Sequence, residues 1–223
     1  MKAYRNLLRR FLIKVNWWRN VRFGYNPKGY WKGELGYLGF WAEAALSAKA
    51  DNLKLAQSVV VPLLIRLGGG ETILDAGCGA GWKTYSFASI YRLAVGVDFQ
   101  RHRLSFAKQH FSRPNVHYQE AELQGLPFAN DSFDTIWTGT VLSHIPMEAK
   151  TKAVEEFKRV LSPSGFCLFS EVILDGEGMA FESRGHMIVV TLDWLRARFA
   201  PFRVEVLDPA VTGYPGPLLY VHS

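Results

Sequence analysis

Three glycines stand at every second position after an apolar run in residues 73–84, whose sequence is ILDAGCGAGWKT. The apolar residues predict a strand that leads into Asp75, and Gly77, Gly79 and Gly81 follow it. Glycine allows a backbone to adopt left-handed conformations and to approach a ligand closely, so glycines just after a strand are typical of a ligand-binding loop. The neighbouring residues must decide which ligand the loop holds.

Two common nucleotide-binding patterns fail at this loop. A phosphate-binding P-loop, GxxxxGK[ST], has a lysine directly after its last glycine, whereas Trp82 separates Gly81 from Lys83 here. A dinucleotide-binding loop, GxGxxG, needs a third glycine for close packing of helix on strand, and Trp82 occupies that position. The dinucleotide-binding pattern is the closer of the two, because Gly77 and Gly79 supply its first two glycines.

The remaining pattern, Asp75-x-Gly77-x-Gly79-x-Gly81, resembles motif I of the class I S-adenosylmethionine-dependent methyltransferases. Asp98 ends the next apolar run, 19 residues after Gly79. Three later segments are similar to further motifs of that family, in the same order: residues 122–134 (ELQGLPFANDSFD), residues 140–145 (TVLSHI) and residues 157–165 (FKRVLSPSG). The resemblance covers about residues 71 to 175, and four motifs in order are a specific signal.

The resemblance implies S-adenosyl-L-methionine as the cofactor and S-adenosyl-L-homocysteine as its product. It places the loop of Gly77, Cys78, Gly79 and Gly81 close to the methionine and ribose portions. It also implies a set of single contacts. Asp75 would hold a backbone amide beneath the loop or receive the cofactor's ammonium group through water, and Asp98 would accept hydrogen bonds from both ribose hydroxyls. Around the adenine, Phe99 would lie against the ring face, Glu122 would accept a hydrogen bond from the amino group, and the Leu123 amide would reach a ring nitrogen. Thr138 would line the pocket under the sulfonium.

Some of these residues have structural alternatives. Asp75 and Glu122 could instead cap a helix or loop, and Glu122 stands where the family usually has Asp. Tyr30 and Trp31 resemble an aromatic pair that covers the cofactor in relatives, with plain core packing as the alternative.

A general base is needed only when the methyl acceptor loses a proton during transfer. His144 follows the fourth predicted strand and Glu171 ends the fifth, at the edge where open α/β sheets bind ligands, so both are candidate catalytic residues. His144 could instead pack the following helix, and Glu171 could bind a substrate cation. His186 lies in a polar, glycine-rich loop predicted over residues 174–187 and is a weaker candidate.

Apolar runs and helical spacing alternate along the chain, which predicts a mostly parallel sheet covered by helices on both faces. The resemblance makes this an α/β, Rossmann-like, seven-stranded sheet whose last strand is antiparallel. The predicted strands are Glu71–Ala76, Leu93–Phe99, Val116–Ala121, Phe133–Thr138, Phe166–Ile173, Phe202–Leu207 and Leu218–Val221. The predicted helices are Trp41–Leu67, interrupted near Asp51 and kinked at Pro62, Trp82–Tyr91, Arg101–His110, Pro146–Leu161 and Thr191–Phe199.

The N-terminal segment is strongly basic. Residues 1–33 hold nine Lys and Arg side chains and no carboxylate, and residues 3–18 have the spacing of an amphipathic helix. We expect an arm or lid over residues 1–40 and a methyltransferase domain over residues 41–223. The arm suits an anionic membrane surface or a nucleic acid. Neither a signal peptide nor a membrane-spanning run is expected, and two distant cysteines favour a reducing, cytoplasmic setting without a metal site.

The sequence therefore predicts a methyltransferase that acts on a small molecule or on a glycan or lipid intermediate. Its predicted location is the cytoplasm, and the basic arm would allow it to act at a membrane surface. An RNA- or ribosome-directed methyltransferase is the first alternative. An NAD-linked oxidoreductase or a non-catalytic nucleotide-binding domain is the alternative from another class. The methyl acceptor, its reacting atom and the oligomeric state are not predicted.

Overall fold

The computed structural model of the 223-residue chain describes residues 49–174, 176–178, 181–184 and 187–223. The predicted N-terminal arm, its amphipathic helix, Tyr30, Trp31 and His186 lie outside these residues, so those predictions remain predictions. In the part of the chain that is described, no helix is both long enough and apolar enough to cross a bilayer.

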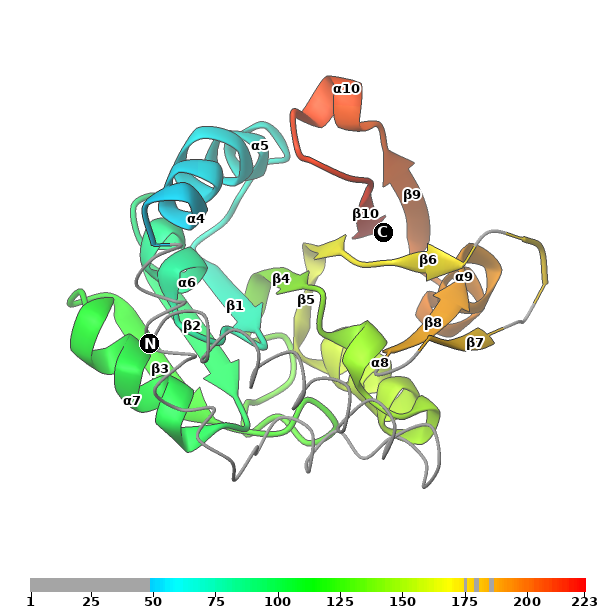
Figure 1. The fold of residues 1–223 in the computed structure, drawn as a ribbon, viewed down its shortest axis with the longest axis horizontal. Coiled ribbons are helices and arrows are strands. Elements are labelled where there is room, and N and C mark those ends of the chain that lie inside the picture. Colours follow the sequence, from blue (N-terminus) through cyan, green and yellow to red (C-terminus); the bar gives the residue numbers. More distant parts are fainter. Residues whose placement is uncertain (1–48, 175, 179–180, 185–186) are drawn as a thin grey trace, which may run out of the picture.

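A seven-stranded sheet forms the centre of the molecule (Figure 1). Its strand order is β3-β2-β1-β4-β5-β10-β9, and β10 runs antiparallel to both of its neighbours while the other neighbouring pairs are parallel. The strands are β1 (Thr72–Ala76), β2 (Leu93–Asp98), β3 (Val116–Glu120), β4 (Phe133–Gly139), β5 (Leu161–Ser170), β9 (Arg203–Leu207) and β10 (Leu218–His222). The predicted sheet, with its last strand antiparallel, is confirmed.

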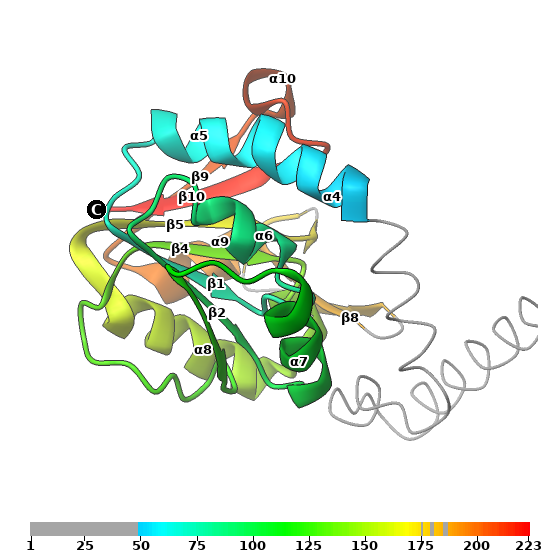
Figure 2. The same cartoon turned by 90° about the vertical axis from the view of Figure 1, so that its left-hand side faces the viewer.

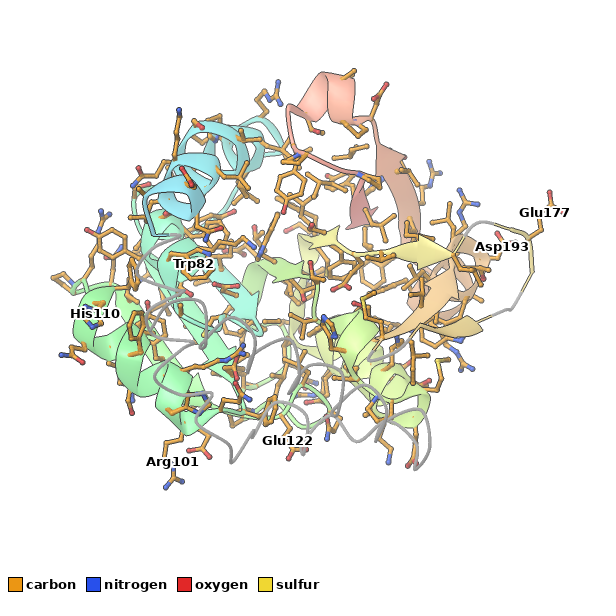
Figure 3. The ribbon with its side chains drawn as sticks, viewed as in Figure 1. Trp82, Arg101, His110, Glu122, Glu177 and Asp193 are labelled. Atoms are coloured by element: carbon orange, nitrogen blue, oxygen red, sulfur yellow. The ribbon has the colours of Figure 1, made fainter. Side chains whose placement is uncertain are left out.

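Helices cover both faces of this sheet (Figure 2). On one face lie α4 (Lys49–Leu55), the π-helical turn Ala56–Val60, α5 (Val61–Arg66) and α6 (Trp82–Phe87), and the opposite face carries α8 (Met147–Val160) and α9 (Leu192–Phe199). Helix α7 (Arg101–His110) packs on β2 and β3, and its Arg101 projects away from the body to pair with Glu120 at 2.8 Å (Figure 3). A four-residue helix, α10 (Pro209–Thr212), joins β9 to β10.

The core explains why the strands read as nearly continuous apolar runs. Ile73 and Leu74 of β1 are both fully buried, yet they belong to different core clusters on opposite faces of the sheet. Successive strand side chains point to opposite faces, so a strand that is covered on both faces needs apolar residues at both positions.

The helix before β1 differs from its prediction. In the described part it continues through Asp51 without interruption, and its irregularity is the π-helical turn Ala56–Val60, in which the Val61 N–H donates to the Ala56 carbonyl. Pro62 has no N–H to donate and its ring crowds the preceding turn, so the helix widens just before it.

The polar loop predicted over residues 174–187 is partly wrong, because it contributes to a second, three-stranded sheet. Strand β8 (Met187–Thr191) pairs in parallel with β6 (Ile173–Leu174) and antiparallel with β7 (Phe181–Arg184). The predicted fifth strand is accordingly split, since β5 ends at Ser170 and β6 belongs to the small sheet. These strands are short and depend on pairing with one another, which local periodicity does not reveal.

Candidate active site

The glycine loop forms where β1 ends, and two of its amides are held by the neighbouring strand. The N–H groups of Gly77 and Cys78 both donate to the Val97 carbonyl at 2.8 Å. Gly77, Gly79 and Gly81 have φ angles of +79°, +54° and +84°, which are left-handed values that favour glycine. The loop geometry therefore requires the glycine spacing seen in the sequence.

The outer two glycines also allow close packing. A Cβ atom on Gly77 would lie 2.5 Å from Cγ2 of Val141, and one on Gly81 would lie 2.5 Å from the Tyr118 hydroxyl oxygen. Gly77 lines the cavity beside Asp98, whereas Gly81 is the N-cap residue just before helix α6 and packs against Tyr118 of β3. Within the glycine loop, Gly77 therefore shapes the cavity wall, whereas Gly81 allows the start of α6 to pack on β3.

Asp98 connects the end of β2 to the loop. Its Oδ2 accepts a 3.0 Å hydrogen bond from the Gly79 N–H, and its Oδ1 accepts one of 2.9 Å from the Gln100 N–H. The side chain is only 6% exposed, and this burial raises the pKa of Asp98 even though the Arg103 cation opposes the shift. Each carboxylate oxygen has a second lone pair, so Asp98 can still accept from a ligand.

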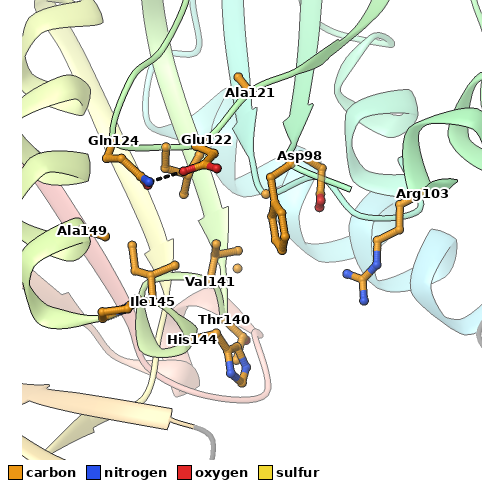
Figure 4. A pocket seen from close by; sticks show the side chains of 15 residues that line it. Asp98, Arg103, Ala121, Glu122, Gln124, Thr140, Val141, His144, Ile145 and Ala149 are labelled. Atoms are coloured by element: carbon orange, nitrogen blue, oxygen red, sulfur yellow. Dashed lines mark hydrogen bonds between the residues drawn. The ribbon is translucent and has the colours of Figure 1, made fainter. Parts of the chain in front are cut away.

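A cavity of about 540 Å³ opens beside Asp98 at the carboxyl ends of β1, β2 and β4 (Figure 4). This is the edge at which open α/β sheets bind ligands. Its walls are Gly77, Asp98, Phe99, Arg103, Ala121, Glu122, Leu123, Gln124, Gly139, Thr140, Val141, His144, Ile145, Pro146 and Ala149.

Six of the residues expected at the site line this cavity: Gly77, Asp98, Phe99, Glu122, Leu123 and His144. Six others do not: Asp75, Cys78, Gly79, Gly81, Thr138 and Glu171. Tyr30 and Trp31 fall outside the described residues. The cavity therefore brings together the residues expected around ribose and adenine with the candidate base His144, whereas the other six lie outside its lining.

Asp75 faces helix α6 instead of the cavity. It is 2% exposed, and its Oδ2 accepts a hydrogen bond from the Thr84 hydroxyl at 2.5 Å. Burial raises the pKa of Asp75 to about 6, against the opposing effects of the Thr84 hydrogen bond and the Lys83 cation. This geometry is that of a residue that anchors the first turn of α6, which is the capping alternative considered above.

Thr138 and Cys78 are also buried away from the cavity. Thr138 is fully buried, and its hydroxyl finds no hydrogen-bond partner among the described residues. Burial raises the pKa of the Cys78 thiol well above its ordinary value, so this cysteine is an unreactive packing residue.

At the other end of the cavity, the segment after β3 carries two polar side chains that interact. The Gln124 amide donates to the Glu122 carboxylate, and both side chains lie on the cavity wall (Figure 4). The Ala121 N–H donates to the Asp98 carbonyl at 3.2 Å, which ties this segment to the end of β2. Glu122 and Asp98 are thereby held at neighbouring strand ends.

His144 and Glu171 are placed very differently. His144 ends the short 3₁₀ helix Leu142–His144 and lies on the cavity wall. The Glu171 carboxylate accepts hydrogen bonds from three backbone N–H groups, those of Val141 (2.7 Å), Leu142 (3.0 Å) and Ser143 (3.2 Å). Burial raises the pKa of Glu171, and the three amides counteract that effect. Glu171 thus fixes the turn that carries His144.

A second cavity of about 700 Å³ adjoins the first at Thr140, which lines both. Thr140 has a φ of +57°, and its N–H donates to the Ser170 carbonyl at 2.6 Å. The second cavity lies over the ends of β5 and β6 and the segment before β10, with walls that include Glu171, Val172, Leu174, Leu192, Val206 and Tyr214.

Sequence reasoning missed several cavity residues, Arg103, Gln124 and Thr140 among them. Arg103 had a usable signal, because it stands in the first turn of the helix that follows the acidic strand end. Gln124 lies inside the segment already matched to the family. Thr140 begins the matched segment 140–145, but its place between two cavities comes from the meeting of two strand ends.

The donor set fits an adenosyl ligand. A buried carboxylate with spare acceptor positions suits a ribose diol, and Phe99, Leu123 and Ile145 supply apolar walls for a purine. Among the described residues, no group of three or more His, Cys, Asp or Glu side chains is arranged to hold a metal ion. The fold and the site together are those of a nucleoside-cofactor enzyme with a Rossmann-like sheet.

Comparison with known proteins agrees with this description. Residues 73–165 match the family model described as a methyltransferase domain. The chain is 28% identical over 144 residues to an O-methyltransferase of Penicillium expansum, covering 62% of this chain and 51% of that protein. It is 30% identical over 129 residues to the malonyl-[acyl-carrier protein] O-methyltransferase of Buchnera aphidicola, covering 56% and 51%. The chain thus spans about half the length of these curated relatives.

Among solved structures, the fold is similar to a SAM-dependent methyltransferase from Aquifex aeolicus, with a TM-score of 0.57, 18% identity, and coverage of 76% of this chain and 90% of that one. At this identity the likeness concerns the fold. Residues 73–165 therefore match a methyltransferase domain, and the fold is similar to that of S-adenosylmethionine-dependent methyltransferases, for which S-adenosylmethionine is the cofactor.

Proposed function

We propose that the protein transfers a methyl group from S-adenosylmethionine to a small-molecule acceptor. The observation that carries this proposal is the position of Asp98, whose buried carboxylate lines the main cavity while the Gly79 and Gln100 amides hold it in place. A carboxylate fixed in this way recognises a ribose diol with little reorganisation when the ligand binds.

The other cavity residues take the remaining parts of the cofactor. Phe99 and Leu123 enclose the adenine, Glu122 with its partner Gln124 accepts from the adenine amino group, and Gly77 borders the space for the methionine portion. When bound, S-adenosylmethionine supplies an electrophilic methyl group on a sulfonium. The protein then has to align an acceptor and exclude water, and alignment can lower the barrier by about 7–11 kcal/mol.

We assign the base role to His144 and a positioning role to Glu171. His144 lies on the wall near Thr140, where the two cavities adjoin. The name of the Penicillium expansum relative describes an O-methyltransferase, and a base is needed when the accepting oxygen is a hydroxyl that loses its proton during transfer, whereas the carboxylate of a malonyl group needs none. Glu171 is occupied by three amides and holds the turn that presents His144.

The second cavity is the proposed acceptor site. It meets the cofactor cavity at Thr140, and Val172 and Val206 on its wall are 40% and 46% exposed, which is high for large apolar side chains. These features favour an acceptor with an apolar portion. We further predict that the acceptor is a glycan or lipid intermediate and that the basic arm of residues 1–40 binds the membrane surface at which it lies.

Isothermal titration calorimetry with S-adenosylhomocysteine and, separately, NADH tests the proposal. We expect binding of S-adenosylhomocysteine and no heat with NADH. Binding of NADH alone would instead support the oxidoreductase alternative and end the methyltransferase proposal.

The arm is tested separately. Flotation with anionic liposomes and salt titration of RNA binding, each with the full chain, distinguish the two anionic partners. Retention of liposome binding with loss of RNA binding at moderate salt favours the membrane surface, and the opposite result favours the RNA-directed alternative.

A further inference from the structure

Lys83 lies beside the end of β4, close to the main cavity. It is the second residue of α6, its side chain is half-buried, and its Nζ would be 2.7 Å from a Cβ atom placed on Gly139. Gly139 is the last residue of β4 and lines the cavity. The glycine thus leaves the space that the ammonium group occupies.

No acceptor satisfies this ammonium group among the described residues. The Lys83 Nζ lies over the Trp137 ring, 5.0 Å from its centroid. The Asp75 carboxylate interacts electrostatically with Lys83, but Asp75 already accepts a hydrogen bond from the Thr84 hydroxyl. A half-buried cation without a hydrogen-bonded or ion-paired acceptor favours a site that a ligand anion completes.

A second hydrogen-bond donor without a partner lies at the same place. Trp137 is fully buried, and its Nε1 has no hydrogen-bond partner among the described residues. That nitrogen would be 3.4 Å from the same Cβ position on Gly139. Buried donors are normally satisfied, so the unpartnered Trp137 donor beside a half-buried ammonium group indicates that an acceptor is missing there.

The sheet register connects this place to the ribose site. Ala76 of β1 pairs with Thr138 of β4 and with Val97 of β2, so Gly139, Gly77 and Asp98 follow one another across three adjacent strand ends. Adjacent strands are about 4.8 Å apart, which puts the ends of β2 and β4 roughly 10 Å apart. An amino-acid tail that begins at a ribose on Asp98 and passes over Gly77 reaches the region of Gly139.

We propose that Lys83 binds the α-carboxylate of the cofactor's amino-acid tail, with Gly139 providing the space for its ammonium group. This inference rests on the proposed function, because it assumes that the adenosyl ligand occupies the main cavity. Lys83, whose position does not fit a phosphate-binding P-loop, would thus bind a carboxylate instead of a phosphate.

The test compares ligands that differ only in the tail. The affinities of S-adenosylhomocysteine, its carboxamide analogue and 5′-methylthioadenosine, which lacks the amino-acid group, are measured by calorimetry. Wild-type protein should bind S-adenosylhomocysteine more tightly than the carboxamide. In Lys83→Met, affinity for S-adenosylhomocysteine should fall ~10- to 100-fold, as for a lost charge-assisted hydrogen bond, while affinity for 5′-methylthioadenosine stays unchanged.

Two further variants sharpen the result. Gly139→Ala should produce the same selective loss, because its Cβ displaces the ammonium group. Lys108→Met removes the same charge from an exposed position on α7 and should change neither affinity. Lys83→Gln replaces Lys83→Met if thermal melting shows that the latter is not folded.

The outcomes separate the two proposals. If Lys83→Met weakens all three ligands equally, or none, Lys83 is a structural residue and the inference is wrong while the proposed function stands. If wild-type protein binds none of the adenosyl ligands, the proposed function fails and the inference fails with it.

Discussion

The carboxylate of Asp98 accepts a 3.0 Å hydrogen bond from the backbone N–H of Gly79, which joins the end of β2 to the glycine loop after β1. One side chain therefore shapes the loop and faces the cavity that the loop borders. This double task explains why an acidic residue at a strand end and a glycine pattern 19 residues earlier belong to one site.

Replacing Asp98 by Ala should weaken binding of S-adenosylhomocysteine by ~10- to 100-fold, because the ribose loses a charge-assisted acceptor and the loop loses its anchor. Calorimetry measures the change. Glu120→Ala is the matched control, since this carboxylate ends the adjacent strand and forms an exposed pair with Arg101. Equal affinity of Asp98→Ala and wild-type protein would contradict the assigned role.

Gly77→Ala should lower both stability and cofactor affinity. The new Cβ would lie 2.5 Å from Val141 at a φ of +79°, so we expect a loss of about 2 kcal/mol or more in the free energy of unfolding. Urea denaturation provides the measurement. Gly125→Ala serves as the control because, within the described part of the chain, no heavy atom beyond its two chain neighbours lies within 4 Å of its Cβ position, and its change should stay within about 0.5 kcal/mol.

Glu171→Ala should destabilise the protein by about 3 kcal/mol, because three backbone N–H groups in a buried turn lose their acceptor. Glu171→Gln keeps one acceptor oxygen and should lose less. Denaturant unfolding of both variants is compared with that of Glu155→Ala, which removes an exposed carboxylate from its ion pair with Lys158 and should change little. A Glu171→Ala protein as stable as Glu155→Ala would show that the carboxylate does not hold the turn.

Asp75 should make stability depend on pH in the acidic range. Its folded-state pKa is about 6 and its ordinary value is 3.8, so the unfolded chain ionises first as the pH rises. The ionisation therefore removes about 3 kcal/mol of stability between pH 4 and pH 6. Asp75→Asn should lack this decrease. Urea denaturation of both proteins across that range tests it, and parallel pH profiles would refute the assignment.

His144→Gln should leave the affinity for S-adenosylhomocysteine unchanged but abolish methyl transfer to hydroxyl acceptors, because the ring acts on the acceptor's proton. Transfer of labelled methyl from S-adenosylmethionine to a panel of small hydroxyl compounds measures the effect. If the panel contains an acceptor for wild-type protein and the variant retains full activity on it, His144 packs the cavity wall without acting as a base.

Residues with local signals were predictable from the sequence. The strand at Thr72–Ala76 is apolar at consecutive positions, the glycines that follow have left-handed φ angles, and Asp98 ends the next strand. Each of these features follows from the geometry of a few neighbouring residues, so a short stretch of sequence contains the information.

Other features depend on residues that meet only after folding. The amides that occupy Glu171 lie about thirty positions earlier in the chain, and Lys83 meets Gly139 only because β1 and β4 are adjacent in the sheet. The small sheet of β6, β7 and β8 likewise needs partner strands that no local pattern specifies. Amino-acid order therefore determined the loop and its carboxylate, whereas tertiary packing decided which polar groups face the cavity, because burial and hydrogen-bond partners are properties of the assembled chain.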